Sequence, residues 1–395
     1  MSIYAKLGVR TLINAAGSLT RLGGTLMPPE VWQVMAEAAQ AFVSIDELQA
    51  KASQIIAEIT GAEAGYVTSG AAAGLALATA ACVTGLDPAK MNRLPDISGL
   101  KDEVLIPKGQ RDGYDHAVRV VGVKLIEVGM PYRTYPYEID AAINERTAAI
   151  LYIVARSKGT ISLPDVIDVA RRREVPVIVD AAAELPPAGN LRAFIAQGAD
   201  LVVFSGGKAL HGPQASGILC GRRDLIAAAA LQHLDMDVDP VTWSPPGELI
   251  DRSLMPGPPE QGLGRMLKVG KEEIVGLLTA LQLYIARDHE ADQRTWEAQA
   301  RHIAEAVASL PGVQTEVFPA AMTAPGIPQA RIILDEAILG LTAYDLIRRL
   351  KAGDPSIHVV EYLAAEGAIE INPMNLQPGE PGIVAERLRQ VLQGE

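Results

Sequence analysis

The segments VPVIVD (residues 175–180) and LVVFSGGK (residues 201–208) decide the fold. Each is a short apolar run, rich in β-branched residues, of the kind that forms a buried strand of a parallel sheet. Asp180 stands at the carboxyl end of the first run, and Lys208 lies just beyond the end of the second. The segment between them suits one crossover helix, so the two strands are expected to be neighbours. Ligands bind beyond the carboxyl ends of such strands, and the sequence therefore predicts acid and amine in one site.

Further short apolar runs alternate with helix-sized spacers through the first two thirds of the chain, at residues 11–14, 65–68, 103–106, 124–128 and 148–154. This alternation predicts an α/β fold with a mostly parallel sheet. A helix is expected over residues 30–60, closed by Gly61. A long helix over 271–310 and alternating segments near 330–334, 358–362 and 368–371 indicate a smaller α+β domain. The expected division is an N-terminal segment (1–40), a large domain (41–255) and a small domain (256–395).

Composition excludes several classes of protein. The chain has 395 residues, 49% hydrophobic and 21% charged, which excludes a disordered chain. A formal net charge of −12 opposes a nucleic-acid partner. The chain shows neither an apolar signal core nor an apolar run that could span a bilayer, and Cys82 and Cys220 are interpreted as core residues. We expect a cytoplasmic protein with a small-molecule substrate, no membrane partner and no metal.

Two glycine-containing segments favour a bound ligand. Ser69-Gly70 joins a strand to an alanine-rich helix, where unpaired N–H groups attract an anion, although simple helix capping is an alternative. Gly206, Gly207 and Gly212 surround Lys208, which favours a functional lysine over a surface ion pair. Dinucleotide and Walker motifs are absent, since the similar GRMLKVGK (264–271) has the wrong spacing.

An anion site, a carboxylate and a lysine are the three groups that pyridoxal 5'-phosphate requires. A helix N-terminus binds the phosphate, the lysine bonds to the aldehyde carbon, and the carboxylate keeps the pyridine nitrogen protonated. The sequence therefore predicts a pyridoxal-phosphate enzyme.

Motifs along nearly the whole chain resemble one family. They are LINAAG (12–17), ITGAEA (59–64), SGAAA (69–73), GYDHA (113–117), VDAAAE (179–184), FSGGK (204–208) with GPQ (212–214), GRMLKVGKE (264–272) and NPMNLQPGE (372–380). The chain is similar to the SelA-like (selenocysteine synthase) group of fold-type I pyridoxal-phosphate enzymes, nearest to its D-glucosaminate-6-phosphate ammonia-lyase branch. The resemblance implies the aspartate aminotransferase-like fold and a homodimer or higher homo-oligomer.

The resemblance also implies roles for individual residues. Lys208 would bond to the cofactor, Asp180 would pair with its pyridinium nitrogen, and Ala182 would lie under the ring. The phosphate would be held by Ser69, Gly70, Ala71 and Ser205. His116 is expected to stack on the other ring face, the alternative being a loop or capping histidine.

Substrate recognition rests on basic residues. Arg265 and Lys268 would approach the site, from the same or the partner subunit, the alternative being a basic cluster flanking a helix. Glu370 stands where related enzymes often place an arginine for the substrate carboxylate, so Arg265 or Arg331 would take that role, or the substrate differs. His211 would support the lysine loop. The LINAAG motif begins at residue 12, so we expect the N-terminal tRNA domain of the synthases to be missing. The acidity of the chain also makes aminoacyl-tRNA a poor substrate candidate.

The function expected from these residues is β-elimination on a small hydroxylated amino acid or amino sugar acid, with release of ammonia. Racemisation and aldol cleavage begin in the same way and stay open as alternatives. A non-catalytic or transferase-like relative is the third alternative, although the presence of both Lys208 and Asp180 argues against it.

Overall fold

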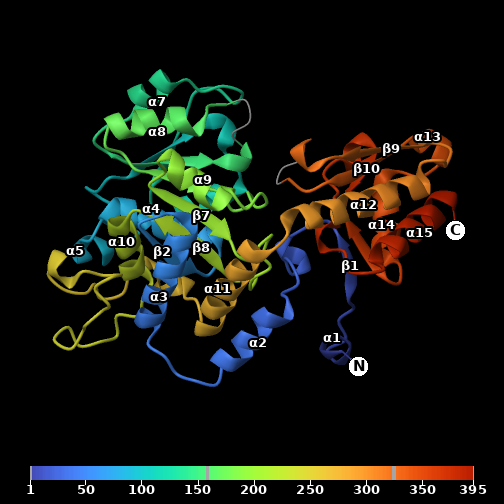
Figure 1. Ribbon diagram of the computed structural model, residues 1–395. Coiled ribbons are helices and arrows are strands. Elements are labelled where there is room, and N and C mark those ends of the chain that lie inside the picture. Colours follow the sequence, from blue (N-terminus) through green and yellow to red (C-terminus); the bar gives the residue numbers. More distant parts are fainter. Residues whose placement is uncertain (1, 157–159, 323–325, 395) are drawn as a thin grey trace. The chain divides into compact units, whose positions relative to one another are not determined.

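The computed structural model describes residues 2–156, 160–322 and 326–394, in two compact units (Figure 1). Met27–Ala286 form the larger unit, and Met1–Leu26 with Arg287–Glu395 form the smaller one. The boundaries expected at 40/41 and 255/256 lie inside the larger unit. The reason is that α2 (Pro29–Ala38) and α11 (Lys271–Ala286), which flank those boundaries, pack against each other.

A seven-stranded sheet forms the centre of the larger unit. Strand β8 is antiparallel to both of its neighbours, and every other neighbouring pair is parallel. The expected α/β fold with a mostly parallel sheet is therefore confirmed, but β8 was not predicted, because glycine at both ends weakens its strand signal. The order is β2 (Ala64–Thr68), β8 (Gly217–Gly221), β7 (Leu201–Ser205), β6 (Val177–Asp180), β5 (Thr147–Ile153), β3 (Glu103–Pro107) and β4 (Lys124–Val128).

Helices cover the sheet, and β5, β6 and β7 are buried along almost their whole length. Strands buried on both faces read as continuous apolar runs, which explains why the sequence revealed them so clearly. One group of helices that pack on each other and on the sheet is α4 (Ala71–Thr84), α6 (His116–Arg119) and α10 (Arg223–His233). Another is α3 (Ile45–Thr60), α9 (Asn190–Gln197), α8 (Leu163–Arg172) and α7 (Pro136–Ala142).

Two expected long helices are each broken by a cap. The helix expected over 30–60 is α2 followed by α3, and Ser44 caps α3 by accepting a hydrogen bond from Glu47 N at 3.3 Å. The helix expected over 271–310 is α11 followed by α12 (His289–Val307), with Asp288 accepting from Ala291 N at 2.9 Å. Apolar spacing continues through residues 39–44, and the polar interruption at 287–290 is only about one helical turn long, so periodicity alone did not reveal either break. Gly61, at φ 74°, ends α3 as expected.

The smaller unit has the expected α+β composition. Strands β9 (Val313–Phe318), β10 (Gln329–Leu334) and β12 (Ala368–Ile371) form an antiparallel sheet, and β1 (Leu12–Ala15) pairs in parallel with β11 (Ser356–Val359). A shared apolar core joins these strands to α12, α14 (Ala343–Ala352) and α15 (Glu380–Gln393).

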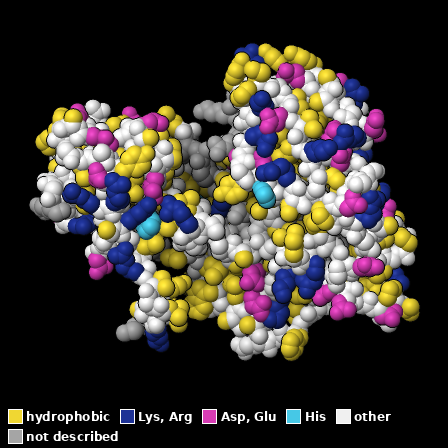
Figure 2. Space-filling view, turned by 180° about the vertical axis from the view of Figure 1, so that it is seen from behind, with side chains coloured by type: hydrophobic (Ala, Val, Ile, Leu, Met, Phe, Trp, Pro, Cys, Tyr) yellow, Lys and Arg dark blue, Asp and Glu magenta, His cyan; other side chains and the backbone are white. Residues whose placement is uncertain are grey.

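The surface carries mixed charge. Acidic and basic side chains alternate over the face shown in Figure 2. Within the described parts of the chain, no helix has both the length and the apolar character that a membrane span requires. Cys220 is buried in β8, where burial raises the pKa of its thiol to about 12, and Cys82 packs against the core of the same unit.

Candidate active site

Asp180 and Lys208 lie at the same edge of the sheet. Asp180 is the last residue of β6, and Lys208 follows the end of β7 by three residues. The two strands are parallel neighbours, with Asp180 beside Val203, and α9 forms the crossover between them. The strand arrangement predicted from residues 175–208 is therefore confirmed.

Asp180 is a buried carboxylate, only 8% exposed. Its Oδ1 accepts a hydrogen bond from Ala182 N at 3.0 Å, and among the described residues its second oxygen has no hydrogen-bond partner. Burial raises the pKa of Asp180, while the Ala182 N–H and the charge of Lys208 act in the opposite direction. A cationic donor placed at the second oxygen would therefore stabilise the ionised carboxylate.

Lys208 lies in a tight turn that glycine makes possible. Gly206 N donates to Ser216 O, and Gly212 N donates to Gly206 O, both at 2.9 Å. A Cβ on Gly206 would lie 2.1 Å from Ser216 Oγ, and one on Gly207 would lie 2.7 Å from Gln214 Cα. The sequence indicated a backbone around Lys208 that can approach a neighbour closely, and in the structure Gly206 and Gly207 let the turn pack on residues 214–216.

His211 supports this turn through its backbone. Its N–H donates to Lys208 O at 2.9 Å, and its φ of 56° places it in the left-handed region. The role expected for His211 thus falls on its main chain rather than on a described side-chain contact with Lys208.

Glu184 is a second carboxylate near the amine, and the sequence analysis missed it. The chain turns after β6, where Glu184 N donates to Ala181 O at 3.1 Å, and this turn keeps Glu184 near Lys208. Burial lowers the pKa of Lys208, while the charges of Asp180 and Glu184 raise it. Burial also raises the pKa of Glu184 itself. The signal that could have revealed Glu184 is the motif VDAAAE, in which an acid stands at each end of three alanines.

Glu184→Gln is expected to lower the pKa of Lys208 further. A carboxylate stabilises the neighbouring ammonium, so its removal leaves more neutral amine at any given pH below that pKa. The rate at which cofactor-free protein reacts with pyridoxal should then reach its plateau at a lower pH than in the wild type. Glu174→Gln, at an exposed position, is the control and should leave the profile unchanged. A profile that moves to higher pH, or does not move, would contradict this electrostatic role of Glu184.

The turn between β2 and α4 forms an open cradle. Gly70, at φ 127°, precedes α4 without a side-chain cap, so the first N–H groups of the helix lack intrahelical partners. A Cβ on Gly70 would meet nothing within 4 Å, whereas one on Gly217 would lie 2.6 Å from Gly70 C and 2.8 Å from Ala71 N. The cradle is thus closely packed on the side of Gly217 and open on the side of Gly70, which suits an anion.

Strand β8 connects the cradle to the lysine turn. Gly217 is paired with Thr68 of β2 on one side and with Ser205 of β7 on the other. Ser205, half-buried, therefore lies at the same level of the sheet as the cradle and three residues before Lys208. The structure brings together the predicted residues Ser69, Gly70, Ala71, Asp180, Ala182, Ser205 and Lys208 along this edge.

The basic segment after α10 also reaches the cradle within one subunit. Ser69 Oγ donates to Leu267 O at 2.6 Å, at the end of the short 3-10 helix η6 (Leu263–Leu267). Arg265 pairs with Asp235 at 3.3 Å, and Lys268 is exposed just beyond η6. Both basic residues therefore belong to a segment that contacts the cradle turn.

The described contacts of His116, Arg331 and Glu370 are with residues other than Asp180 and Lys208. His116 is exposed on α6, its Nδ1 3.4 Å from Arg119 Nη2, and no described contact joins it to Asp180 or Lys208. Arg331 and Glu370 lie in the smaller unit, where Arg331 Nη2 donates to Glu370 Oε1 at 2.8 Å. Tyr362 OH donates to the second Glu370 oxygen. The buried Glu370 therefore orients Arg331, and both of its carboxylate oxygens accept hydrogen bonds.

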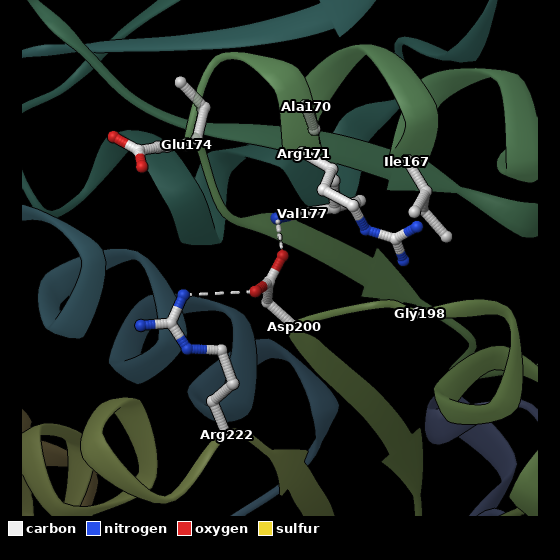
Figure 3. A pocket seen from close by; sticks show the side chains of 9 residues that line it. Ile167, Ala170, Arg171, Glu174, Val177, Gly198, Asp200 and Arg222 are labelled. Carbon is white, nitrogen blue, oxygen red and sulfur yellow. Dashed lines mark hydrogen bonds and ion pairs between the residues drawn. The ribbon is translucent and has the colours of Figure 1, made fainter.

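A hollow of about 390 Å³ lies at the opposite edge of the sheet (Figure 3). Asp200 accepts from Val177 N at 2.8 Å and pairs with Arg222 at 3.2 Å. These charges compensate each other at the amino ends of β6 and β7, so this hollow is separate from the site of Lys208.

Comparisons with known proteins agree along the whole chain. Residues 12–239 match the family described as SelA, L-seryl-tRNA selenium transferase. The chain is 35% identical to D-glucosaminate-6-phosphate ammonia lyase of Salmonella typhimurium, covering 99% of this chain and 98% of that protein. It is 33% identical to 5'-C-glycyluridine monooxygenase-decarboxylase of a Streptomyces species, covering 98% and 92%. A solved structure of D-glucosaminate-6-phosphate ammonia-lyase matches with a TM-score of 0.83 and 34% identity, covering 100% and 99%.

Proposed function

This chain belongs to the SelA family, and from this premise we propose that it is a pyridoxal-phosphate-dependent ammonia-lyase acting on an amino sugar acid. The observation that carries the proposal is the position of Asp180 and Lys208 on adjacent strand ends beside an open anion cradle. The full-length similarity to an ammonia lyase supports the choice of reaction.

The residues at this edge fit pyridoxal 5'-phosphate. The N-terminus of α4 and Ser205 would hold the phosphate, and the second oxygen of Asp180 would accept from the pyridine nitrogen. Lys208 would bond to the aldehyde carbon, and Ala182 leaves room under the ring. His116 remains our prediction for the other ring face. When bound, the cofactor withdraws the electron pair that the broken Cα–H bond leaves behind.

Lys208 is the proposed base. Burial lowers the pKa of its amine, so a larger fraction is neutral and able to take the Cα proton than in water. Asp180 would accept a charge-assisted hydrogen bond from the ring nitrogen and so stabilise its positive charge. Lys208, which then carries the Cα proton, would pass it to the hydroxyl on the adjacent carbon, so that this group leaves as water. The enamine that remains would tautomerise to an imine, and its hydrolysis would yield a 2-oxo acid and ammonia. Arg265, Lys268 and Arg331 stay candidates for substrate anions.

Product analysis tests this function. Purified protein with pyridoxal phosphate is given amino sugar acids, D-glucosaminate and its 6-phosphate among them, and ammonia and 2-oxo acid are measured. Equal amounts of both products support the lyase. An inverted enantiomer would show a racemase, glycine with an aldehyde would show an aldolase, and no turnover with any amino acid would favour a non-catalytic or transferase-like relative.

A second candidate follows from the Streptomyces relative, whose similarity also spans the chain. An oxygen-dependent decarboxylation of a glycyl-nucleoside would consume O₂ and release CO₂. An oxygen electrode distinguishes it from the lyase, which releases ammonia without consuming O₂.

Gly217→Ala is expected to weaken cofactor binding by about tenfold or more, because the new Cβ displaces the backbone of the phosphate cradle. The measurement is the Kd of pyridoxal phosphate for cofactor-free protein. Gly247→Ala is the matched control, since a Cβ there meets nothing within 4 Å. Equal affinity in the two variants would show that the cradle does not hold the phosphate.

We propose that the chain assembles with copies of itself as a homodimer or higher homo-oligomer in the cytoplasm. Support comes from exposed apolar side chains on and after α2, with Trp32 50%, Val43 52% and Phe42 fully exposed. Sedimentation equilibrium tests the assembly, and cell fractionation tests the location.

A further inference from the structure

The main-chain carbonyl of Leu267 accepts two hydrogen bonds. Ser69 Oγ donates from the cradle turn at 2.6 Å, and His233 Nε2, at the end of α10, lies 2.9 Å away. A carbonyl oxygen has two lone pairs, so both are used. Three segments that are distant in the sequence thus meet at one oxygen atom.

The protonation of His233 follows from its partners. A carbonyl can only accept, so Nε2 carries the hydrogen, and Nδ1 then accepts from Tyr66 OH at 2.9 Å. His233 is 4% exposed and Tyr66 is fully buried. Burial has the largest effect and lowers the pKa of His233. The hydrogen bond to Leu267 raises this pKa, and the charge of Arg265 lowers it again. The lowered pKa favours the neutral ring, and in that ring the two partners fix the tautomer with the hydrogen on Nε2.

The segment that carries Leu267 is held firmly on α10. Leu263 N donates to Gln232 Oε1 at 3.0 Å. A Cβ on Gly262 would lie 2.4 Å from Gln232 Cα, and one on Gly264 would lie 2.8 Å from Gln232 O. This close packing fixes the position of the Leu267 carbonyl beside the cradle.

A phosphate group changes the requirements at Ser69. The oxygens of a phosphate dianion only accept, so the Ser69 hydroxyl can hold the phosphate only by turning its hydrogen away from Leu267. Without a second donor, the carbonyl would then lose its hydrogen-bond partner, which would weaken phosphate binding.

We propose that His233 is a positioning residue for cofactor binding, which keeps the Leu267 carbonyl hydrogen-bonded while Ser69 turns its hydroxyl to the phosphate. The inference rests on the proposed function, because it takes the cradle as the phosphate site. Tyr66 assists by fixing the tautomer that donates from Nε2.

The test compares pyridoxal phosphate with pyridoxal, which lacks the phosphate. Cofactor-free His233→Leu should bind pyridoxal phosphate about tenfold more weakly than the wild type, and pyridoxal equally well. Ser69→Ala should show the same selectivity. The double variant should bind pyridoxal phosphate no more weakly than Ser69→Ala alone, because the His233–Leu267 hydrogen bond matters only when Ser69 donates to the phosphate.

Two further variants keep the test decisive if His233→Leu does not fold. His233→Gln retains an N–H near Leu267 and should recover most of the affinity. Tyr66→Phe should show a smaller loss, again for pyridoxal phosphate only. Thr60→Val, which removes a buried hydrogen bond to the Ile56 carbonyl within α3, is the control and should show no selective loss.

The outcomes separate the inference from the function. Equal weakening of both ligands by the His233 variants, or affinities unchanged in folded variants, would overturn the role of His233. A wild-type protein that binds neither ligand would instead overturn the proposed cofactor.

Discussion

Lys208→Arg is expected to lose the covalent link to the cofactor and to lower turnover by about 10²–10⁴-fold or more, the usual contribution of a general base. Arginine keeps the positive charge beside Asp180 and Glu184, so the surroundings of the buried carboxylates change little. It cannot bond stably to the aldehyde, and it stays protonated at neutral pH.

Borohydride reduction followed by peptide mass spectrometry measures this link directly. In the wild type the added mass should fall on the peptide that contains residue 208, and in Lys208→Arg it should disappear. Lys124→Arg, an exposed lysine on the edge strand β4, is the control and should retain link and activity. A reduced cofactor found on another lysine, or full turnover by Lys208→Arg, would contradict the role of Lys208.

The central strands were predictable because they are buried on both faces. The runs at 175–180 and 201–208 have no polar interruption before their ends, so their type and their neighbouring position could be inferred. The breaks at Ser44 and Asp288 were not, because each depends on one capping side chain that begins a new helix, after an interruption too short for the spacing to show.

The site was predictable only where it lies within short motifs. Asp180, Lys208 and the turn at Ser69-Gly70 each follow a strand directly, and strand order alone brings them to one edge. His233 ends an alanine-rich helix without any motif, and its partner Tyr66 lies in the interior of β2. Contacts of that kind depend on how α10 packs on β2, which neither periodicity nor spacing reveals.

Asp180→Asn is expected to lower turnover by about 10²–10³-fold, the loss typical of removing one electrostatic group from a site. Asparagine fills the same space but cannot keep the pyridine nitrogen protonated. Activity assayed at saturating pyridoxal phosphate checks this effect.

The same substitution is expected to raise the Tm of the cofactor-free protein at neutral pH. Burial raises the pKa of Asp180, so the ionised carboxylate destabilises the fold at pH values above that pKa, and neutral asparagine removes the cost. The Tm difference between variant and wild type should shrink as the pH falls and Asp180 takes up its proton.

Asp200→Asn, at the opposite edge of the sheet, is the matched control. Its carboxylate pairs with Arg222, so this variant should lower the Tm and leave turnover unchanged. If Asp180→Asn instead lowered the Tm as Asp200→Asn does, Asp180 would be a structural ion-pair partner. A carboxylate that costs stability without the cofactor, and is required for turnover with it, is the behaviour expected of a group placed for a cationic ligand.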